Sequence, residues 1–417
     1  MKKRYPIVIL VIALLFCTKN VDSDSTNIRS VLVNCHRPYF PGELLVKFKP
    51  WVSMKTATSI HHAFGVSQIR EGYNASYQII KVPSSKEKEI AKAYSKRPEV
   101  EYAELNYYRY IHANPNDRYY RLQWNFPLIN LPEAWDLSTG DGVTVAVVDT
   151  GVNPFGVDGF GRLFWNRLLM GYNAILGIPG GIDLHGHGTH VAGTIGQETN
   201  NWIGVAGIAF DAKILPVKVL SFIGEGLDSW VIDGIRWATN HGADIINLSF
   251  GGGYPSEALE DAINYAYENR VTVVAASGND GNDEVDYPAA YDNCIAVGAV
   301  RYDKSLTYYS NYGDALDLVA PGGDKSVDQN GDGYVDGILQ ETFWFLGMGW
   351  WYRYKSGTSM ASPHVAGVAA LVKSLHPEYE ADDIRQVLQE TAEDLGDPGW
   401  DETYGYGLVN AYAAVSE

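Results

Sequence analysis

The sequence is poor in cysteine and has no apolar run long enough to cross a membrane. Its 417 residues include three cysteines at widely separated positions, so a framework of structural disulfides is not expected. Beyond the N-terminal segment only Cys35 and Cys294 remain, and we expect Cys294 to be a small buried side chain rather than a reactive thiol. The apolar run near the start has ten residues, whereas a membrane-spanning helix needs roughly 20.

That run, Ile7 to Phe16, follows three basic residues and precedes a polar stretch, which is the pattern of a secretory signal peptide. We therefore separate residues 1–23 from the fold as a signal peptide that ends at the small residue Ser23, and we expect a secreted, extracellular protein. The alternative is a lipid anchor on Cys17. Phe16 disfavours it, because a small residue normally precedes a lipidated cysteine.

Positive charge is scarce in most of the chain. Residues 114–417 contain 15 Lys and Arg against 41 Asp and Glu, whereas residues 24–113 contain 13 against 8, and the formal net charge is −18. A strongly acidic body disfavours nucleic acid as a partner. We expect the basic N-terminal part to complement this body electrostatically.

Two parts of different pattern follow the signal segment. From Leu44 to about Asn106 the residues predict, in chain order, strand, helix, strand, helix and strand: GELLVKF, SMKTATSIHHAF, SYQIIKV, SKEKEIAKAYSKR and VEYAELN. This order is typical of a small α+β module, and the following segment IHANPNDRYY indicates a linker. We therefore place one domain at 24–112 and a larger one at 113–417.

The larger domain alternates apolar strands with amphipathic helices. Its continuous apolar runs are typical of strands buried on both faces: VTVAVVD, KILPVKVL, ADIINLSF, VTVVAASGN and CIAVGAV. SWVIDGIRWATNHG and SEALEDAINYAYENR have helical spacing of apolar residues. The pattern predicts an α/β fold with a mostly parallel sheet and helices on both faces, with an active site at the carboxyl ends of the strands.

The segment Ser356–Gly367, SGTSMASPHVAG, places four hydroxyl groups at the start of a helix. Such residues commonly cap a helix N-terminus. Alternatively, one hydroxyl is a nucleophile at the positive end of the helix, where negative charge is stabilised. The segment by itself leaves both interpretations open.

Three polar residues elsewhere are candidate partners for a nucleophile. Asp149 ends an apolar strand, His187 lies between glycines in DLHGHGTHVAGTIG, and Asn279 follows another apolar strand in a glycine-flanked loop. Each also has a structural interpretation as a turn former, a helix cap or a residue in a left-handed turn. We expect His190 and His364, on helices of small residues, to be packing histidines.

Together these residues supply every role of a serine hydrolase. A hydroxyl nucleophile needs an imidazole to take its proton, and the imidazole needs a carboxylate to fix its tautomer and stabilise its cation. The oxyanion formed from the attacked carbonyl needs preorganised donors, which a side-chain amide and a helix N-terminal amide provide. Asp149, His187, Asn279 and Ser359 fit these four roles.

Over residues 113–417 the chain resembles the subtilisin-like serine proteases. The resemblance lies in AVVDTGVN, HGHGTHVAGT, INLSFGG, ASGNDG and SGTSMASPHVAG. It implies that Ser359 is the nucleophile, that His187 is the general base and then the acid, and that Asp149 orients His187, in the chain order of subtilisin. It also implies that Asn279 and the backbone amide of Ser359 bind the oxyanion.

Two other functions are compatible with parts of the sequence. Asp183, His185, His187 and His190 are zinc-binding residue types, but no HExxH helix is present and glycines separate the imidazoles. A non-catalytic protein on the same fold is disfavoured because no catalytic position is substituted. We therefore expect a monomeric serine endopeptidase that acts on protein or peptide substrates.

The resemblance also covers the module at 24–112. It implies a prodomain that assists folding, inhibits the active site inside the same chain and is then removed by self-processing. We expect ferredoxin-like packing, with the C-terminal strand and tail of the module lying in the substrate cleft. The cut is expected between Asn106 and Asn116.

Substrate is expected to bind as an extra strand between two segments of the protein. The expected contact residues are Ser249, Phe250, Gly251, Gly224, Glu225 and Gly226. By motif, the wall of the first specificity pocket contains Ala276, Ser277 and Gly278. Asp286, together with Asp280, would place negative charge at the rim or floor of this pocket and favour Lys or Arg; alternatively, both acids face solvent.

The loop DQNGDGYVD indicates a calcium site. Its oxygen side chains alternate ahead of a glycine, as in the first half of an EF-hand loop. The predicted ligands are Asp328, Asn330, Asp332, the carbonyl of Tyr334, and Asp336. Asp336 must compensate for Leu339, which occupies the position of the usual bidentate acid. The alternative is an acidic turn without metal.

A second loop, TNNWIGVAG, resembles the calcium loop of the family. The resemblance implies a structural calcium ion with side-chain ligands from Asn201, Asp158 and Gln123. It further implies carbonyl ligands from Thr199, Ile203 and Val205. The alternative is a plain surface loop.

Overall fold

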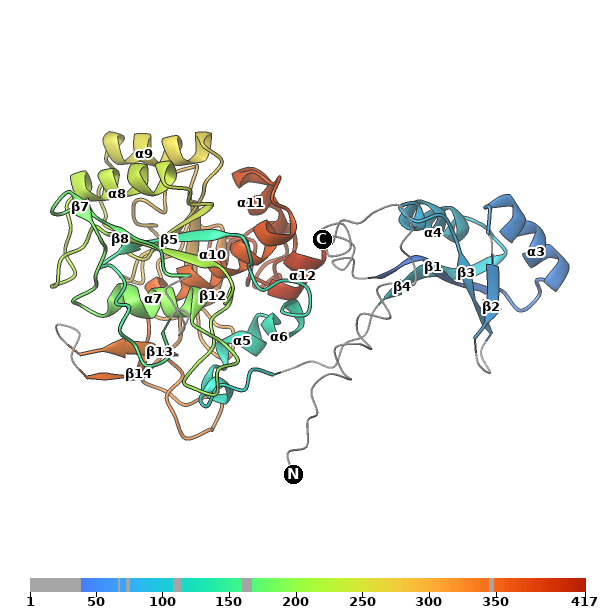
Figure 1. Cartoon of the computed structure of the whole chain (residues 1–417), viewed down its shortest axis with the longest axis horizontal. Helices are drawn as coiled ribbons and strands as arrows, with labels where there is room; N and C mark the ends of the chain where they lie inside the picture. Colours follow the sequence, from blue (N-terminus) through green and yellow to red (C-terminus); the bar gives the residue numbers. More distant parts are fainter. Residues whose placement is uncertain (1–38, 67, 73–75, 108–113, 160–166, 345–348) are drawn as a thin grey trace, which may run out of the picture. The chain divides into compact units, whose positions relative to one another are not determined.

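The computed structural model describes most of residues 39–417, and the chain divides into two compact units, Met1–Ile111 and His112–Glu417 (Figure 1). The segments left undescribed are 1–38, 67, 73–75, 108–113, 160–166 and 345–348. The expected signal peptide, Cys17 and Cys35 lie outside the described residues, as does part of the segment in which the prodomain cut is expected. Within the described part of the chain, no helix has the length and apolar character to cross a membrane.

The first unit contains a four-stranded antiparallel sheet in the order β2–β3–β1–β4. Its elements along the chain are β1 (Tyr39–Phe48), α3 (Met54–Ala63), β2 (Gln68–Glu71), β3 (Tyr77–Lys81), α4 (Glu87–Ser95) and β4 (Val100–Tyr107). This combination of chain order and strand order is the expected ferredoxin-like arrangement. The sequence does not predict β2, because all four of its residues are exposed and it has no apolar pattern.

Local sequence explains the elements of this unit. β1 alternates between core and surface, with Leu44 and Val46 fully buried. The hydroxyl of Ser53 caps α3 by accepting the N–H of Thr56 at 3.2 Å. The unit therefore has an apolar core of its own, to which Ile80 also contributes.

The second unit is built on an eight-stranded sheet in the order β12–β11–β10–β9–β5–β8–β6–β7. Its strands are β5 (Thr144–Asp149), β6 (Tyr172–Asn173), β7 (Ile178–Pro179), β8 (Lys213–Lys218), β9 (Ile245–Leu248), β10 (Thr272–Ala276), β11 (Ile295–Val300) and β12 (Leu318–Pro321). Neighbouring strands are parallel except β6 and β7. Every residue of β5, β9, β10 and β11 is buried, which explains their continuous apolar sequences.

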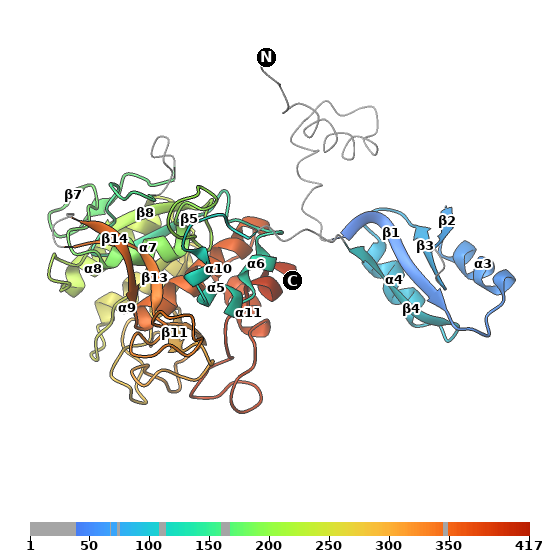
Figure 2. The same cartoon turned by 90° about the horizontal axis from the view of Figure 1, so that it is seen from below.

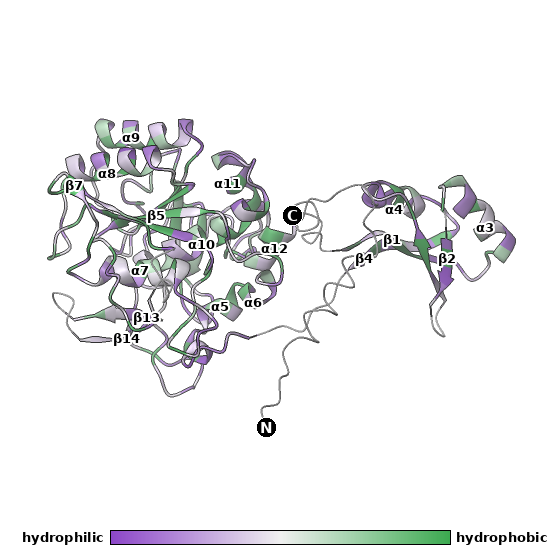
Figure 3. Ribbon diagram, in the orientation of Figure 1, coloured by the Kyte–Doolittle hydropathy of each residue, from purple (hydrophilic) through white to green (hydrophobic). Residues whose placement is uncertain are grey.

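Helices cover both faces of this sheet (Figure 1), which confirms the predicted architecture. α8 (Asp228–Asn240) and α9 (Glu257–Glu268) pack together on one face, and α7 (His187–Gly196) and α10 (Thr358–Leu375) pack together on the other. The ribbon of α9 alternates between hydrophobic and hydrophilic colour (Figure 3), as expected for a helix with one buried face. The remaining helices are η3 (Tyr120–Leu122), α5 (Asn125–Leu128), α6 (Leu131–Ala134), α11 (Ala381–Glu390) and α12 (Ala411–Ser416).

A separate hairpin of β13 (Ile338–Phe343) and β14 (Trp350–Lys355) lies against α7, on the side of the sheet away from α8 and α9 (Figures 1 and 2). All residues of β13 are buried, whereas those of β14 are partly exposed. The Arg353 guanidinium lies 4.8 and 4.9 Å from the ring centres of Trp344 and Trp351, which ties the two strands together.

Cys294 lies just before β11 and is 2% exposed and unpaired. Burial raises the pKa of its thiol, so the reactive thiolate is disfavoured. The expectation of a small buried side chain is confirmed.

The parallel order brings three strand ends to one edge of the sheet. Val148 on β5 is in register with Leu248 on β9, which is in register with Ala275 on β10. Asp149 is the last residue of β5, and Ser249 comes directly after β9. Both therefore lie at the carboxyl ends of neighbouring strands, where α/β folds place their active sites.

Candidate active site

The carboxylate of Asp149 holds the imidazole of His187. Asp149 is the last residue of β5 and has no exposed surface, and His187 is the first residue of α7. Nδ1 of His187 lies 2.9 Å from each carboxylate oxygen of Asp149. Because a carboxylate accepts hydrogen bonds, Nδ1 carries the proton and Nε2 remains as the basic nitrogen.

Asp149 stays ionised although it is buried. Burial by itself raises its pKa, but the charge of His187, the hydrogen bond to His187 and the hydrogen bonds from Thr150 outweigh burial and lower the pKa below its usual value. Thr150 donates its backbone N–H to Oδ1 of Asp149 at 2.6 Å. Asp149 is therefore suited to orient His187 and to stabilise its cation.

A glycine makes room for this pair at the start of α7. A Cβ atom on Gly188 would lie 2.2 Å from the carbonyl oxygen of Gly151 and 3.0 Å from Oδ1 of Asp149. The N–H of Gly188 instead donates to the hydroxyl of Thr150 at 2.9 Å. The glycine after His187 thus allows the helix to begin close to the buried acid.

Ser359 is the second residue of α10. Its hydroxyl donates a hydrogen bond to the carbonyl oxygen of Ser249 at 2.8 Å. Ser249 follows β9, the strand beside β5, so the hydroxyl lies at the sheet edge that carries Asp149. Among the hydrogen bonds of the described residues, its partner is Ser249 and not His187.

The side chain of Asn279 is fixed at the N-terminus of α10. Its amide oxygen accepts hydrogen bonds from the backbone N–H and the hydroxyl of Thr358, at 2.9 and 3.1 Å. The amide nitrogen is thereby left to donate elsewhere. Together with the N–H of Ser359 it can offer two donors where the helix dipole favours negative charge.

The other hydroxyls of this segment have structural partners. Ser362 donates to the side-chain oxygen of Asn247 at 2.8 Å, and Ser356 accepts a backbone N–H at 2.9 Å. The residue that caps α10 is Gly357, which has no side chain with which to bond the first turn. Helix capping therefore does not explain the hydroxyl cluster.

Two side chains of the alternative zinc cluster, those of Asp183 and His190, bond to the backbone of the fold. The carboxylate of Asp183 accepts hydrogen bonds from three backbone N–H groups. Two of these groups belong to the turn before α7, and the third belongs to the first turn of α7. Nε2 of His190 lies 3.1 Å from two backbone carbonyl oxygens of the hairpin. Burial lowers the pKa of His190 well below its usual value and that of His364 to about 4, so both are neutral packing histidines. Within the described residues, no group of three or more His, Cys, Asp or Glu is arranged to hold a metal ion.

The two segments expected to flank a substrate are partly exposed. Gly252 exchanges two backbone hydrogen bonds of 2.9 Å with Tyr287, which fixes the end of the segment that begins at Ser249. In the other segment, the N–H of Ser221 donates to the carbonyl oxygen of Glu225 at 2.8 Å and closes an exposed turn.

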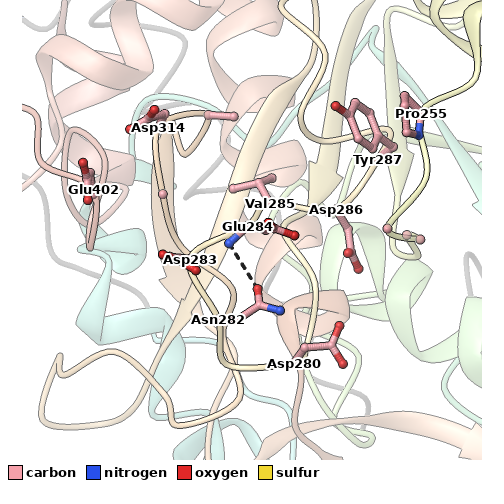
Figure 4. A pocket seen from close by; sticks show the side chains of 15 residues that line it. Pro255, Asp280, Asn282, Asp283, Glu284, Val285, Asp286, Tyr287, Asp314 and Glu402 are labelled. Carbon is pink, nitrogen blue, oxygen red and sulfur yellow. Dashed lines mark hydrogen bonds between the residues drawn. The ribbon is translucent and has the colours of Figure 1, made fainter.

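A pocket of about 830 Å³ opens beside the first of these segments (Figure 4). Its lining residues are Gly251, Gly252, Gly253, Pro255, Asp280, Asn282, Asp283, Glu284, Val285, Asp286, Tyr287, Gly313, Asp314, Ala315 and Glu402. Of the residues expected to surround the substrate, Gly251, Asp280 and Asp286 are among these. Ala276, Ser277 and Gly278, which were expected to form its wall, are buried and do not line it.

Expected calcium ligands around the loop at 199–205 lie together. The amide of Asn201 donates to Oδ1 of Asp158 at 2.8 Å, and the N–H of Val205 donates to Oδ2 at 2.9 Å. Gln123 exchanges hydrogen bonds of 2.7 and 2.9 Å with the backbone of the residue after Val205. The remaining two, Thr199 and Ile203, belong to the same loop.

Asp158 has no exposed surface and lies among other acidic groups. Burial raises its pKa to about 8, hydrogen bonds within the loop oppose this rise, and the charges of Glu341 and Asp117 add to it. The hydroxyl of Tyr352 is buried nearby and has no hydrogen-bond partner within the described residues. Sequence reasoning missed Glu341 and Asp117, because these distant residues belong to no local motif.

In the loop at 328–336, Asp328, Asn330 and Asp332 each accept backbone N–H groups two to five residues further along. Asp336 is 1% exposed; one of its oxygens accepts a backbone N–H, and the other, Oδ1, is buried without a partner within the described residues. Burial and the neighbouring acids raise its pKa. Leu339 belongs to the buried part of β13 and supplies no ligand.

Comparison with protein families gives two matches. The model described as "Subtilase family" matches residues 140–407, and the model described as "Fervidolysin N-terminal prodomain" matches residues 31–106.

Comparison with individual proteins agrees with these matches. A thermophilic serine proteinase from Bacillus sp. (strain AK1) is 37% identical over 91% of this chain and 88% of its own length, and subtilisin BL from Lederbergia lenta is 41% identical over 70% and 98%. A protease from Pseudoalteromonas arctica PAMC 21717 has a TM-score of 0.65 and 36% identity, covering 73% of this chain and 99% of that one. Fervidolysin from Fervidobacterium pennivorans has a TM-score of 0.63 and 28% identity, covering 91% and 61%.

Proposed function

Because the chain belongs to the subtilase family of serine proteases, we propose that it hydrolyses peptide bonds through a triad of Ser359, His187 and Asp149. The observation that carries this proposal is the position of His187, whose Nδ1 lies 2.9 Å from both oxygens of a buried carboxylate. The Ser359 hydroxyl lies at the same edge of the sheet, bonded to the residue that follows β9.

In this mechanism, Oγ of Ser359 attacks the carbonyl carbon of the scissile bond, and its proton passes to Nε2 of His187. Asp149 stabilises the resulting imidazolium through the bonds to Nδ1. His187 then gives the proton to the leaving amine, and an ester between the substrate and Ser359 remains. A water molecule, deprotonated by His187, attacks this ester; His187 then returns the proton to Oγ of Ser359 as the C–O bond breaks, and the acid product is released.

Each attack turns the carbonyl oxygen into an oxyanion. The amide nitrogen of Asn279 and the backbone N–H of Ser359 are proposed to donate to it. The bonds from Thr358 to the amide oxygen support this role, because they fix the side chain with its nitrogen free to donate.

The test is Ser359→Ala, which should abolish peptide hydrolysis while the protein remains folded. Ser356→Ala is the matched control: it removes a hydroxyl from the same segment, one that bonds only a backbone N–H among the described contacts, and it should retain hydrolysis. Equal hydrolysis by Ser359→Ala and the unaltered protein would contradict the assignment.

We further propose that the protease is secreted as a precursor, with a signal peptide at 1–23, a prodomain at 24–112 and the peptidase domain at 113–417. The prodomain family match at 31–106 and the ferredoxin-like sheet support the second part. The excess of basic residues in 24–113 favours its binding to the acidic peptidase as an intramolecular inhibitor. The proposed cut lies between Asn106 and Asn116.

Calcium is proposed as a structural cofactor of the loop at 199–205, held by Asn201, Asp158, Gln123 and loop carbonyls. These are oxygen donors, which suit a hard cation. The buried carboxylate of Asp158 supports the proposal, because a bound cation would compensate its charge. When bound, the ion would join the loop to the chain around Asp158 and stabilise the fold.

A second calcium ion is proposed for the loop at 328–336, with Asp328, Asn330, Asp332, the carbonyl of Tyr334 and Asp336 as ligands. The three carboxylates are not grouped around one point in the described structure, so the loop would have to close around the ion when it binds. The unpartnered, buried Oδ1 of Asp336 supports this site, because a buried carboxylate oxygen without a hydrogen bond is costly unless a cation or proton meets it.

A further inference from the structure

The carboxylate of Asp286 lies between the two segments that would flank a substrate side chain. A Cβ atom on Gly251 would lie 3.2 Å from Oδ2 of Asp286, and one on Gly278 would lie 2.7 Å from the same oxygen. The backbone N–H of Asp286 donates to the carbonyl oxygen of Ser277 at 2.8 Å. Asp286 is thus held by its backbone, and its carboxylate lies beside both glycines.

The two segments on either side of the gap between Gly251 and Gly278 are bonded to the start of α10. The hydroxyl of Ser359 donates to the carbonyl oxygen of Ser249, two residues before Gly251. The hydroxyl of Thr358 donates to the carbonyl oxygen of Gly278 at 3.2 Å. A substrate side chain that enters the gap next to the attacked carbonyl therefore meets the carboxylate of Asp286.

The pocket that continues from this gap is acidic. Six of its lining residues carry carboxylates and none is basic: Asp280, Asp283, Glu284, Asp286, Asp314 and Glu402. Figure 4 shows the carboxylates of Asp286 and Asp280 on the same side of the pocket, with their oxygens turned toward one another. A positively charged group in the gap would therefore be attracted by the carboxylate of Asp286 and by the other carboxylates of the pocket.

We propose that Asp286, with Asp280 beyond it, makes the protease selective for Lys or Arg on the amino-terminal side of the cleaved bond. This inference rests on the proposed protease function. It names Asp286 as a residue that determines specificity.

Two physical effects act in the same direction. A Lys or Arg side chain brings an opposite charge to a half-buried carboxylate, where attraction is stronger than between fully exposed groups. A large apolar side chain in the same gap removes water from that carboxylate without replacing its interactions, which costs free energy. Selectivity comes from both the attraction and the rejection.

The gap also suits a long, unbranched side chain. Neither Gly251 nor Gly278 carries a side chain into it, and Gly278 has a φ of +114°, a conformation that other residues rarely adopt. Lys and Arg reach a distant carboxylate through flexible methylene stems.

The preference should depend on pH. Burial raises the pKa of Asp286, and the charge of Asp280 raises it further. The carboxylate gains its charge as pH rises through this pKa, so the preference for Lys and Arg should strengthen with rising pH and weaken below it. The other titratable groups that line the pocket are all acidic: Asp280, Asp283, Glu284, Tyr287, Asp314 and Glu402.

The test compares peptides that differ only in the residue before the cleaved bond: Lys, Arg, Gln, Leu or Phe. For the mature protease, kcat/KM for Lys and Arg should exceed that for the neutral Gln by at least about tenfold, which corresponds to about 1.4 kcal/mol. Asp286→Asn should remove most of this ratio and raise kcat/KM for the Leu and Phe peptides, because the charged carboxylate that disfavours apolar side chains is gone. Asp286→Glu should keep the ratio. Asp233→Asn, an equal change of charge at an exposed position on α8, is the control and should change nothing.

A ratio that is the same in Asp286→Asn and in the unaltered protease would overturn the inference, as would cleavage of Leu and Phe peptides with no preference for Lys or Arg. If Asp286→Asn does not fold, the pH dependence of the Lys to Gln ratio in the unaltered protease decides, and a flat profile overturns the inference. Failure to cleave any of the five peptides would contradict the proposed function itself, and the inference with it.

Discussion

At the scale of single residues, the tautomer of His187 depends on the carboxylate of Asp149. Asp149→Asn keeps the shape of the side chain but can donate to Nδ1, which would place the imidazole proton on Nε2. We predict that kcat falls by about 10⁴ with little change in KM, because the base is then blocked while substrate contacts persist. Steady-state kinetics check this, with thermal unfolding to show that the variant is folded.

A loss of less than about tenfold in kcat would contradict this account of Asp149, because it would mean that the base works without its buried partner. An increase in KM at constant kcat would also contradict it, since that pattern belongs to a residue that only binds substrate.

The residues of the proposed triad could be predicted from the sequence because the chemistry restricts residue type at each position. Asp149, His187 and Ser359 lie in glycine-rich motifs at the ends of predictable strands and helices, and the structure brings them to one edge of the sheet. Glu341 and Asp117 could not be predicted in the same way. They come close to Asp158 only when distant parts of the chain fold together.

At the scale of elements, the central buried strands were predictable because burial on both faces leaves a continuous apolar run, whereas β12, which is also buried, was not predicted. β5, β9, β10 and β11 have such runs and lie where they were expected. β2, β6 and β7 were missed because they are short and partly or fully exposed, so no apolar pattern marks them.

The two proposed calcium sites lead to a prediction about thermal stability. In the inactive Ser359→Ala protein, calcium should raise the midpoint of thermal unfolding relative to chelator, because the ion binds the folded state only. At 100 times the dissociation constant, one site stabilises by about 2.7 kcal/mol. Asn201→Ala and Asp332→Ala should each remove part of the shift, one from each loop.

In chelator, Asp332→Ala should unfold close to the parent protein, whereas Asn201→Ala should unfold at a lower temperature because it loses the hydrogen bond to buried Asp158. The loss of calcium binding is therefore read from the shift between chelator and calcium within each variant. Equal midpoints with calcium and with chelator, for the parent and both variants, would remove calcium from the account. If only one variant abolishes the calcium-dependent shift of the unfolding midpoint, calcium binds in the loop that contains the substituted residue and not in the other loop.

At the scale of the whole molecule, the proposed self-processing of the precursor can be tested directly. If the active site cuts the segment between Asn106 and Asn116, Ser359→Ala should stay full-length when it is produced in isolation. Mature, unaltered protease added from outside should then shorten it. Gel electrophoresis and N-terminal sequencing check both steps, and normal maturation of isolated Ser359→Ala would contradict self-processing.

The central claim is that Ser359 is the nucleophile, activated by His187 on a subtilase scaffold. The most direct measurement is reaction of the mature protease with a fluorophosphonate, followed by peptide mass spectrometry. We predict one adduct, on Oγ of Ser359, with labelling strongly reduced in His187→Ala because the base is absent. A protease that stays active while Ser359 remains unlabelled, or an adduct on another residue that accounts for inactivation, would contradict the claim.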